Sequence, residues 1–379
     1  MAKYKLGDVC EIVSGSTPKT NIEEYWDGDI KWITPAEIND DTYIITDSIR
    51  KITDLGAKKT GLSLFPEGTV ILSSRAPIGK VAIAGCAMCC NQGFKNLICS
   101  DKILNKYLYW FLKGNTPYLN SLGRGATFRE ISKSIVAQIE INVPDIVYQK
   151  EVVDILEKIS EVITRRKREL FALDNLIKAR FVEMFGNLKI TTTVARYIAE
   201  LRGGKSLAGN EKCKNKVLKT GAATFGWFDP EQYKYLPTDY EPLAEHKVEA
   251  GDVIISRMNT PELVGACSYV FEAPEDMYYP DRLWKVIAKA DTNPIFLWQL
   301  LWDREIRRQI KEKSGGTSGT MHNISKSKLL EIKCIDAPIE LQNQFADFVK
   351  QVDKSKVAVQ KALDETQMLF DSLMQKYFM

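Results

Sequence analysis

Apolar residues recur at a four-three spacing in two long segments of the chain, one after Pro144 and one after Pro338. This spacing predicts an apolar stripe along one face of an α-helix. The two stripes align at an offset of 193 residues, so that Gln149 corresponds to Gln342. One stripe alone would also suit a helix lying on a globular core. Because both stripes share one register and one start signal, we predict that the two helices pair through a coiled-coil seam.

The two helices are predicted over residues 145–186 and 339–379. A proline is tolerated in the first turn of a helix, because the N–H it removes has no intrahelical partner. Phe185-Gly186-Asn187 is a stop signal for the first helix. Each helix would be roughly 60 Å long at ~1.5 Å per residue. The predicted seam consists of Val152, Leu156, Ile159, Ile163, Leu170, Leu173, Ile177, Phe345, Val349, Val352, Val359, Leu363, Phe370 and Leu373.

The segments ahead of the two helices also repeat, less closely. Residues 68–75 match residues 251–257, and residues 125–133 match residues 319–326. Short β-branched runs and apolar helical stretches alternate in both segments. We therefore predict an α+β fold of two globular α/β domains, residues 1–144 and 187–338, separated by a pair of long antiparallel coiled-coil helices. The whole would be an internal pseudo-twofold repeat.

The composition narrows the class of protein. The formal net charge is only +3, so any basic surface must be local. Apolar runs are far shorter than a membrane span, and the first residues lack the apolar core of a signal peptide. We therefore expect a cytoplasmic protein with no membrane partner. The 8 cysteines are expected to be reduced core residues rather than metal ligands, because a second close pair is missing and the only histidines are His246 and His322.

The sequence contains only incomplete versions of known catalytic motifs. Residues 115–118 resemble the tetrad with which adenine methyltransferases hold the flipped amine, but the second position is Thr116 and no glycine-rich cofactor motif accompanies it. Asp281 and Glu331-Ile332-Lys333 are too far apart in sequence to favour a nuclease site. Neither histidine lies near a suitable serine or cysteine in the sequence. We expect a chain that is not an enzyme by itself and holds no cofactor.

Two polar loops are candidates for phosphate binding. Residues 14–19 follow the first strand-like run, and residues 203–206 occupy the comparable place in the second repeat. Glycine-rich and hydroxyl-rich loops with a lysine can hold phosphate oxygens through backbone N–H groups and side chains. The full phosphate-loop motif of nucleotide-hydrolysing enzymes is absent, and as isolated features such loops also suit plain turns.

At this point the sequence resembles the specificity subunits of type I restriction-modification systems, over essentially the whole chain. The resemblance rests on the order of several short stretches within the duplicated plan, none of them specific alone. These are residues 6–8, 16–18, 25–26, 30–35, 68–73 and 91–94, and the glycine-containing block ahead of each proline and helix.

The resemblance implies that the two globular parts are target recognition domains, each reading one half of a bipartite target in double-stranded DNA. It implies that the helices fix the unread spacer and dock two modification subunits, which are methyltransferases binding S-adenosylmethionine. Two restriction subunits would complete an ATP-dependent nuclease and translocase, with ATP and Mg also held by partners. The alternatives are the recognition subunit of another restriction class and a coiled-coil protein scaffold.

Candidate DNA contacts follow from residue type. Arginine and lysine read guanine, asparagine and glutamine read adenine, and hydroxyl and basic side chains hold phosphates. The candidates in the first domain are Ser16, Thr17, Lys19, Ser74, Arg75, Lys80, Gln92, Lys95, Arg124, Thr127 and Arg129. The candidates in the second domain are Lys205, Lys219, Thr220, Arg257, Asn259, Arg282, Thr317, Ser318, His322 and Asn323. The basic run 165–168 fits a solvated helix face, contact with spacer phosphates or contact with a modification subunit.

Overall fold

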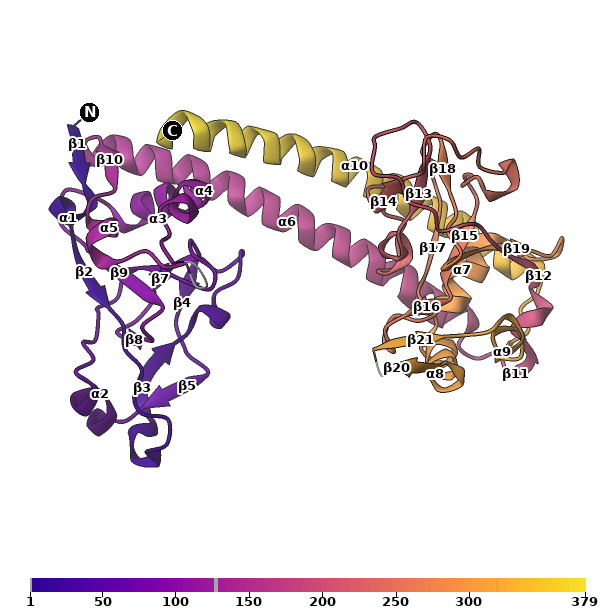
Figure 1. Cartoon of the computed structure of the whole chain (residues 1–379), viewed down its shortest axis with the longest axis horizontal. Coiled ribbons are helices and arrows are strands. Elements are labelled where there is room, and N and C mark those ends of the chain that lie inside the picture. Colours follow the sequence, from indigo (N-terminus) through magenta and orange to yellow (C-terminus); the bar gives the residue numbers. More distant parts are fainter. Residues whose placement is uncertain (1, 126–128, 319) are drawn as a thin grey trace. The chain divides into compact units, whose positions relative to one another are not determined.

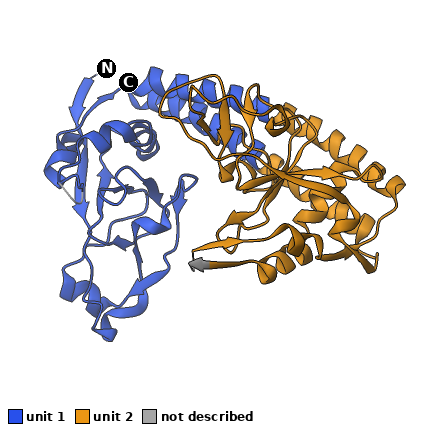
Figure 2. Cartoon of the chain, turned by 45° about the vertical axis from the view of Figure 1, so that its right-hand side comes forward, with its two compact units in different colours: residues 1–167, 360–379 blue, residues 168–359 orange. Residues whose placement is uncertain are grey.

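A computed structural model describes residues 2–125, 129–318 and 320–379. Contacts divide the chain into two compact units (Figure 2). Unit 1 contains residues 1–167 and 360–379, and unit 2 contains residues 168–359. Among the described residues, no helix combines the length and the apolar character needed to cross a membrane.

Unit 1 begins with strands and short helices that are labelled in Figure 1. Its elements, apart from parts of the two long helices, are β1 (Ala2–Lys5), α1 (Leu6–Val9), β2 (Cys10–Ser14), η1 (Glu23–Tyr25), β3 (Trp26–Ile33), η2 (Pro35–Glu37), β4 (Ile44–Ile45), β5 (Arg50–Ile52), α2 (Asp54–Thr60), β6 (Val70–Ser73), β7 (Val81–Ala84), β8 (Cys89–Cys90), β9 (Phe94–Cys99), α3 (Asn105–Gly114), α4 (Thr116–Ser121), α5 (Lys133–Ala137) and β10 (Glu140–Val143).

The main sheet of unit 1 has the strand order β2-β9-β6-β7-β4. Side chains of β6 alternate between its two faces, as the geometry of a strand requires. Val70 and Leu72 join the core that α3 covers, while Ile71 joins a second core on the other face. Both faces are thus buried, which explains why β6 reads as a continuous apolar run. A smaller sheet has the order β5-β3-β8, and β1 pairs with β10.

Unit 2 repeats this plan with different loops. Its elements are β11 (Ile190–Thr193), η3 (Val194–Arg196), β12 (Ile198–Gly203), β13 (Lys216–Leu218), η4 (Thr220–Ala223), β14 (Tyr233–Tyr235), η5 (Ala244–His246), β15 (Val253–Ser256), β16 (Met258–Asn259), β17 (Cys267–Tyr269), β18 (Met277–Tyr278), β19 (Leu283–Ala288), α7 (Pro294–Trp302), α8 (Arg304–Lys313), β20 (Gly315–Ser318), β21 (Met321–Asn323), α9 (Lys326–Leu330) and β22 (Lys333–Ile335).

Two sheets of unit 2 repeat the strand orders of unit 1, except that β4 has no counterpart. The order β12-β19-β15-β17 matches β2-β9-β6-β7, and β14-β13-β18 matches β5-β3-β8. Val253 and Ile255 face the core that contains α7, and Ile254 faces a second core, as in β6. The chain therefore contains one framework twice.

The two long helices are α6 (Ile146–Phe185) and α10 (Ile339–Phe378). Unit 1 contains the start of α6 and the end of α10, where Val152 and Leu156 share a core with Met374. Unit 2 contains the opposite halves, where Phe181 shares a core with Phe345. The helices therefore pair antiparallel within each unit.

None of the predicted seam residues is exposed. The side chains of Phe181, Phe185 and Met374, which were not assigned to the seam, are also buried. They lie where the helix ends pack on the globular cores, so each helix contributes to both units. A division into residues 1–144, 145–186, 187–338 and 339–379 does not capture this sharing.

A buried glutamine fixes each long helix to its unit. Gln149 accepts a hydrogen bond from the Leu104 N–H (2.8 Å) and donates to the carbonyls of Lys102 (2.9 Å) and Pro144 (2.8 Å). Gln342 accepts from the Asn293 N–H (2.9 Å) and donates to the carbonyl of Ala337 (2.8 Å). Both residues are 0% exposed. The two aligned glutamines therefore make equivalent contacts that attach each long helix to its unit. We call each set of these hydrogen bonds a latch.

Candidate nucleic-acid interface

The two candidate phosphate loops are closed by equivalent contacts. In unit 1 the hydroxyl of Thr17 donates a hydrogen bond to Gln92, and in unit 2 the hydroxyl of Ser206 donates to Asp281. Each loop also passes directly over a backbone carbonyl: a Cβ on Gly15 would lie 2.0 Å from the Asn91 oxygen, and one on Gly204 would lie 1.8 Å from the Tyr279 oxygen. Only glycine fits at these two close approaches.

The ends of β6 and β15 meet these loops in the same backbone geometry. The Ser74 N–H donates to the Gly93 carbonyl (2.7 Å), and the Ser74 carbonyl accepts from the Ile131 N–H (3.0 Å). Arg257 makes the same two bonds, to the Arg282 carbonyl (3.0 Å) and from the Ile324 N–H (3.0 Å). Arg257 therefore corresponds to Ser74.

Unit 1 places a charged cluster at this strand end. The Lys95 ammonium lies 3.1 Å from a Glu130 carboxylate oxygen and 3.3 Å from the Ser74 hydroxyl. A guanidinium nitrogen of Arg75 lies 3.7 Å from the other oxygen of Glu130. The Lys95 side chain is only 8% exposed. One carboxylate thus holds two cations that were predicted to contact DNA.

Unit 2 has different side chains at the same framework positions. The register of β15 with β19 puts Trp284 where unit 1 has Lys95. Asn323 replaces Glu130, because each precedes the isoleucine that donates to the strand end. The Arg257 guanidinium carbon lies 5.6 Å from the centre of a Trp284 ring. The Arg257 Nε is buried and has no hydrogen-bond partner among the described residues.

The other candidate DNA-binding side chains of unit 1 differ in exposure and in their hydrogen bonds within the unit. Lys19, Gln92, Arg124 and Arg129 are exposed, whereas Ser16 is half-buried. The Lys80 ammonium donates to the Pro35 carbonyl (2.8 Å), so it positions that loop within the unit. Thr127 lies outside the described residues.

Candidates of unit 2 are spread over several loops. Lys205, Lys219 and Arg282 are exposed, as is Asn323, while Thr220 is half-buried. Asn259 bonds the Ser256 hydroxyl through its amide nitrogen (3.4 Å) and the Thr260 N–H through its amide oxygen (2.9 Å). A His322 ring nitrogen lies 3.0 Å from the Ser314 hydroxyl. The backbone of Thr317 and Ser318 belongs to β20, and their side chains lie outside what the structure describes.

Two participants in these clusters were not predicted as site residues, Glu130 and Trp284. Glu130 lies inside the repeated block, so its replacement by Asn323 was visible in the sequence. Trp284 follows Arg282 in a short apolar run and reads as an ordinary core residue. Only the strand register brings Trp284 under Arg257.

The residues considered for catalysis have structural roles. The Asn115 amide donates to the Phe111 carbonyl (2.8 Å), and the Thr116 hydroxyl donates to the Lys113 carbonyl (3.0 Å). Asp281 is bound to Ser206 in the loop described above. Over residues 2–125, 129–318 and 320–379, no group of three or more His, Cys, Asp and Glu side chains could hold a metal ion.

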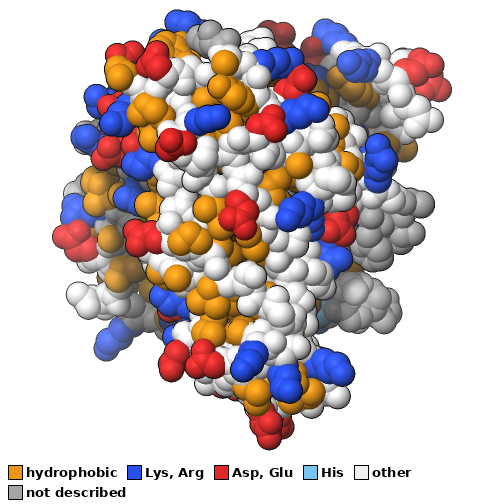
Figure 3. Space-filling view, turned by 90° about the vertical axis from the view of Figure 1, so that its left-hand side faces the viewer, with side chains coloured by type: hydrophobic (Ala, Val, Ile, Leu, Met, Phe, Trp, Pro, Cys, Tyr) orange, Lys and Arg blue, Asp and Glu red, His pale blue; other side chains and the backbone are white. Residues whose placement is uncertain are grey.

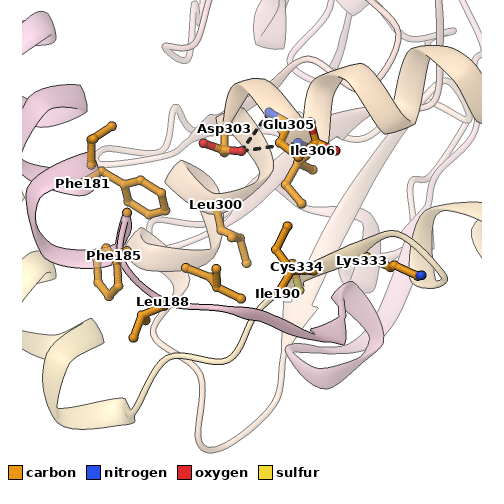
Figure 4. A pocket seen from close by; sticks show the side chains of 13 residues that line it. Phe181, Phe185, Leu188, Ile190, Leu300, Asp303, Glu305, Ile306, Lys333 and Cys334 are labelled. Carbon is orange, nitrogen blue, oxygen red and sulfur yellow. Dashed lines mark hydrogen bonds between the residues drawn. The ribbon is translucent and has the colours of Figure 1, made fainter.

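A hollow of about 190 Å³ in unit 2 is lined mostly by apolar side chains of α6, β11, α7, α8 and β22 and is shown in Figure 4. The Asp303 carboxylate at its rim accepts hydrogen bonds from the N–H groups of Glu305 (2.9 Å) and Ile306 (3.4 Å), capping α8. This carboxylate is therefore engaged in the helix cap. The lining suits an apolar contact rather than a nucleotide phosphate.

Charge on the face of unit 1 seen in Figure 3 is mixed, with basic and acidic side chains interspersed. This agrees with the small net charge of +3. The face seen in this view therefore offers no broad basic surface.

A family model described as type I restriction modification DNA specificity domain matches residues 1–171 and 198–366. The chain belongs to this family. The two matched stretches are the two copies of the framework, which confirms the resemblance and the repeated α+β fold predicted from the sequence.

Two relatives are type I restriction enzyme specificity subunits of Methanocaldococcus jannaschii. The MjaIX subunit is 39% identical over 184 residues, covering 48% of this chain and 43% of that protein. The MjaVIII subunit is 22% identical over 390 residues, covering 94% of this chain and 89% of that protein. The chain therefore spans less than half the length of the first relative and most of the second.

A solved structure shares the fold. The crystal structure of the type I restriction-modification system S subunit from M. genitalium has a TM-score of 0.58 to this chain, with 16% sequence identity. The match covers 100% of this chain and 96% of that one. The likeness thus extends over both repeats and both long helices.

Proposed function

We propose that this chain is the DNA specificity subunit of a type I restriction-modification enzyme, in which each unit reads one half of a bipartite target. The observation that carries the proposal is the strand end shared by both units. The backbone there is the same in unit 1 and unit 2, while Ser74, Lys95 and Glu130 are replaced by Arg257, Trp284 and Asn323. A common framework with different side chains suits two readers that bind in one manner and read different bases.

The long helices would set the number of unread base pairs between the half-sites. Each has 40 residues. Several of their apolar side chains remain exposed in the single chain, including Phe171 at 67%, Val182 at 63% and Met368 at 65%. Apolar surface of this kind favours burial against other proteins. We assign it to two modification subunits.

The chemistry would belong to the partners. Modification subunits would bind S-adenosylmethionine and methylate adenine, and two restriction subunits would use ATP and Mg. The chain itself would be non-catalytic and cytoplasmic, where its DNA substrate is found. The structural use of Asn115, Thr116 and Asp281 supports this division of labour.

Sequencing of methylated adenines tests the proposal. The chain and its modification subunit would be expressed together in cells that lack other adenine methylation. The proposed function predicts one motif with two halves and a fixed gap, lost when either protein is omitted. A continuous motif, or methylation that does not depend on this chain, would contradict it.

A further inference from the structure

Arg257 occupies the strand end at which the two units differ most in chemistry. It directly follows β15 and is anchored on both sides by the backbone bonds to Arg282 and Ile324. Trp284, beneath its guanidinium, is 3% exposed and lies against Gly203, at the start of the predicted phosphate loop. Arg257 therefore lies over a buried ring that also packs beside the start of that loop.

Among the described residues of unit 2, no carboxylate forms an ion pair with Arg257, and its buried Nε has no hydrogen-bond partner. Unit 1 shows the contrasting arrangement, in which Glu130 pairs with both Arg75 and Lys95. An arginine that lies over an aromatic ring and has no carboxylate partner can bind a planar ligand with two acceptors.

We infer that Arg257 is the guanine-reading residue of unit 2, with Trp284 as its positioning residue. The guanidinium fork would donate to the O6 and N7 acceptors that guanine presents in the major groove, the arrangement that arginine makes most often with a base. Unit 1 carries Ser74 at this position and reads its half-site by other groups. The inference rests on the proposed function, because it assigns one base to the half-site of unit 2.

A phosphate contact is the competing role for an unpaired arginine. Loss of a phosphate contact weakens binding to all sequences about equally, whereas loss of a base contact relaxes one position of the target. The methylated motif of a variant therefore distinguishes a base contact from a phosphate contact without a structure of the complex.

The test is the methylation motif of R257Q in cells that also express the modification subunit. The matched control is R308Q, since Arg308 lies on α8 of the same unit and is already paired with Glu305 and Glu312. The R257Q motif is expected to accept other bases at one guanine of one half, with discrimination there falling roughly 10- to 100-fold. The other half and the gap are expected to stay as in the wild type and in R308Q.

A fall in methylation with an unchanged motif would overturn the inference in favour of a phosphate or structural role. If R257Q gives no methylation, competition binding of the assembled R257K methyltransferase to duplexes that vary this guanine decides instead. Reduced discrimination at the guanine supports base reading, and unchanged discrimination overturns it. Exchange of unit 2 for that of a relative identifies the half of the motif that unit 2 reads. If the wild-type motif has no guanine in that half, the role of Arg257 is contradicted but the proposed function is not. Absence of any bipartite motif would contradict the proposed function.

Discussion

Strands β6 and β15 end in the same backbone geometry and carry opposite chemistry there. In unit 1 a carboxylate, Glu130, restrains the cations of Lys95 and Arg75. In unit 2 an arginine rests on Trp284 with no carboxylate among the described residues paired to it. The difference shows that the framework determines where side chains are presented, and that the recognition chemistry depends on a small set of substitutions at fixed positions.

The largest expected effect comes from the latch that both units share. Q149A would remove the hydrogen-bond partner of the Leu104 N–H and of two carbonyls, which are partly or fully buried, so unit 1 should lose about 3 kcal/mol of stability. Q342A should destabilise unit 2 somewhat less, because Gln342 satisfies two groups rather than three. Hydrogen exchange that reports each unit separately would show this, and equal loss of protection in both units for either variant would contradict it.

The close approaches at Gly15 and Gly204 should behave alike. G15A and G204A would each force a Cβ to within about 2 Å of a backbone carbonyl, so each loop must move, at about 2 kcal/mol. Each variant should impair recognition of one half-site only. G315A is the matched control, since nothing lies within 4 Å of a Cβ there. DNA competition binding that finds G15A and G204A as active as G315A would show that these loops take no part.

Removing the carboxylate from the strand end of unit 1, or adding one to that of unit 2, should change the salt dependence of DNA binding in opposite directions. E130Q would release Lys95 and Arg75, lowering stability by about 1 kcal/mol and steepening the salt dependence of DNA binding by about one phosphate contact. N323D would place a carboxylate at the equivalent position of unit 2 and should make the salt dependence shallower. Titrations at several salt concentrations measure both slopes, and slopes that change in the same direction would be inconsistent with the comparison.

The smallest expected effect concerns a cysteine pair that unit 2 lacks. Cys10 and Cys99 are opposite one another on β2 and β9, where the Ser100 N–H donates to the Val9 carbonyl (2.9 Å). That bond makes them a non-hydrogen-bonded pair with Cα atoms about 4.5 Å apart, within the range of a disulfide. Unit 2 has Ile198 and Ala288 at these positions.

Glutathione disulfide is expected to oxidise the two thiols to a disulfide, accepting their two electrons as it becomes two glutathione thiols. The hydrogen bond with Cys99, together with burial, raises the pKa of the Cys10 thiol, so the reaction should be slow at neutral pH and faster at higher pH. Mass spectrometry would detect the loss of two hydrogens, with C99A as the control. DNA binding should change little, and a bridge from Cys10 to another cysteine would contradict the assigned register.

The sequence was sufficient to predict the framework but not the chemistry placed on it. The stripe spacing predicted both long helices, and the alignment of Gln149 with Gln342 marked two latches, because both patterns are local. The pairing of Arg257 with Trp284 depends on the register of β15 with β19, which no local pattern encodes.

Exchange of the globular part of unit 2 is the sharpest test of separate reading by the two units. Residues 187–338 of this chain would be replaced by those of a related specificity subunit, and methylated adenines would be sequenced in cells that also express the modification subunit. If each unit reads its own half-site, one half of the motif is expected to change while the other half and the gap remain. A motif in which both halves change together, or neither does, would contradict the claim that each unit reads its own half.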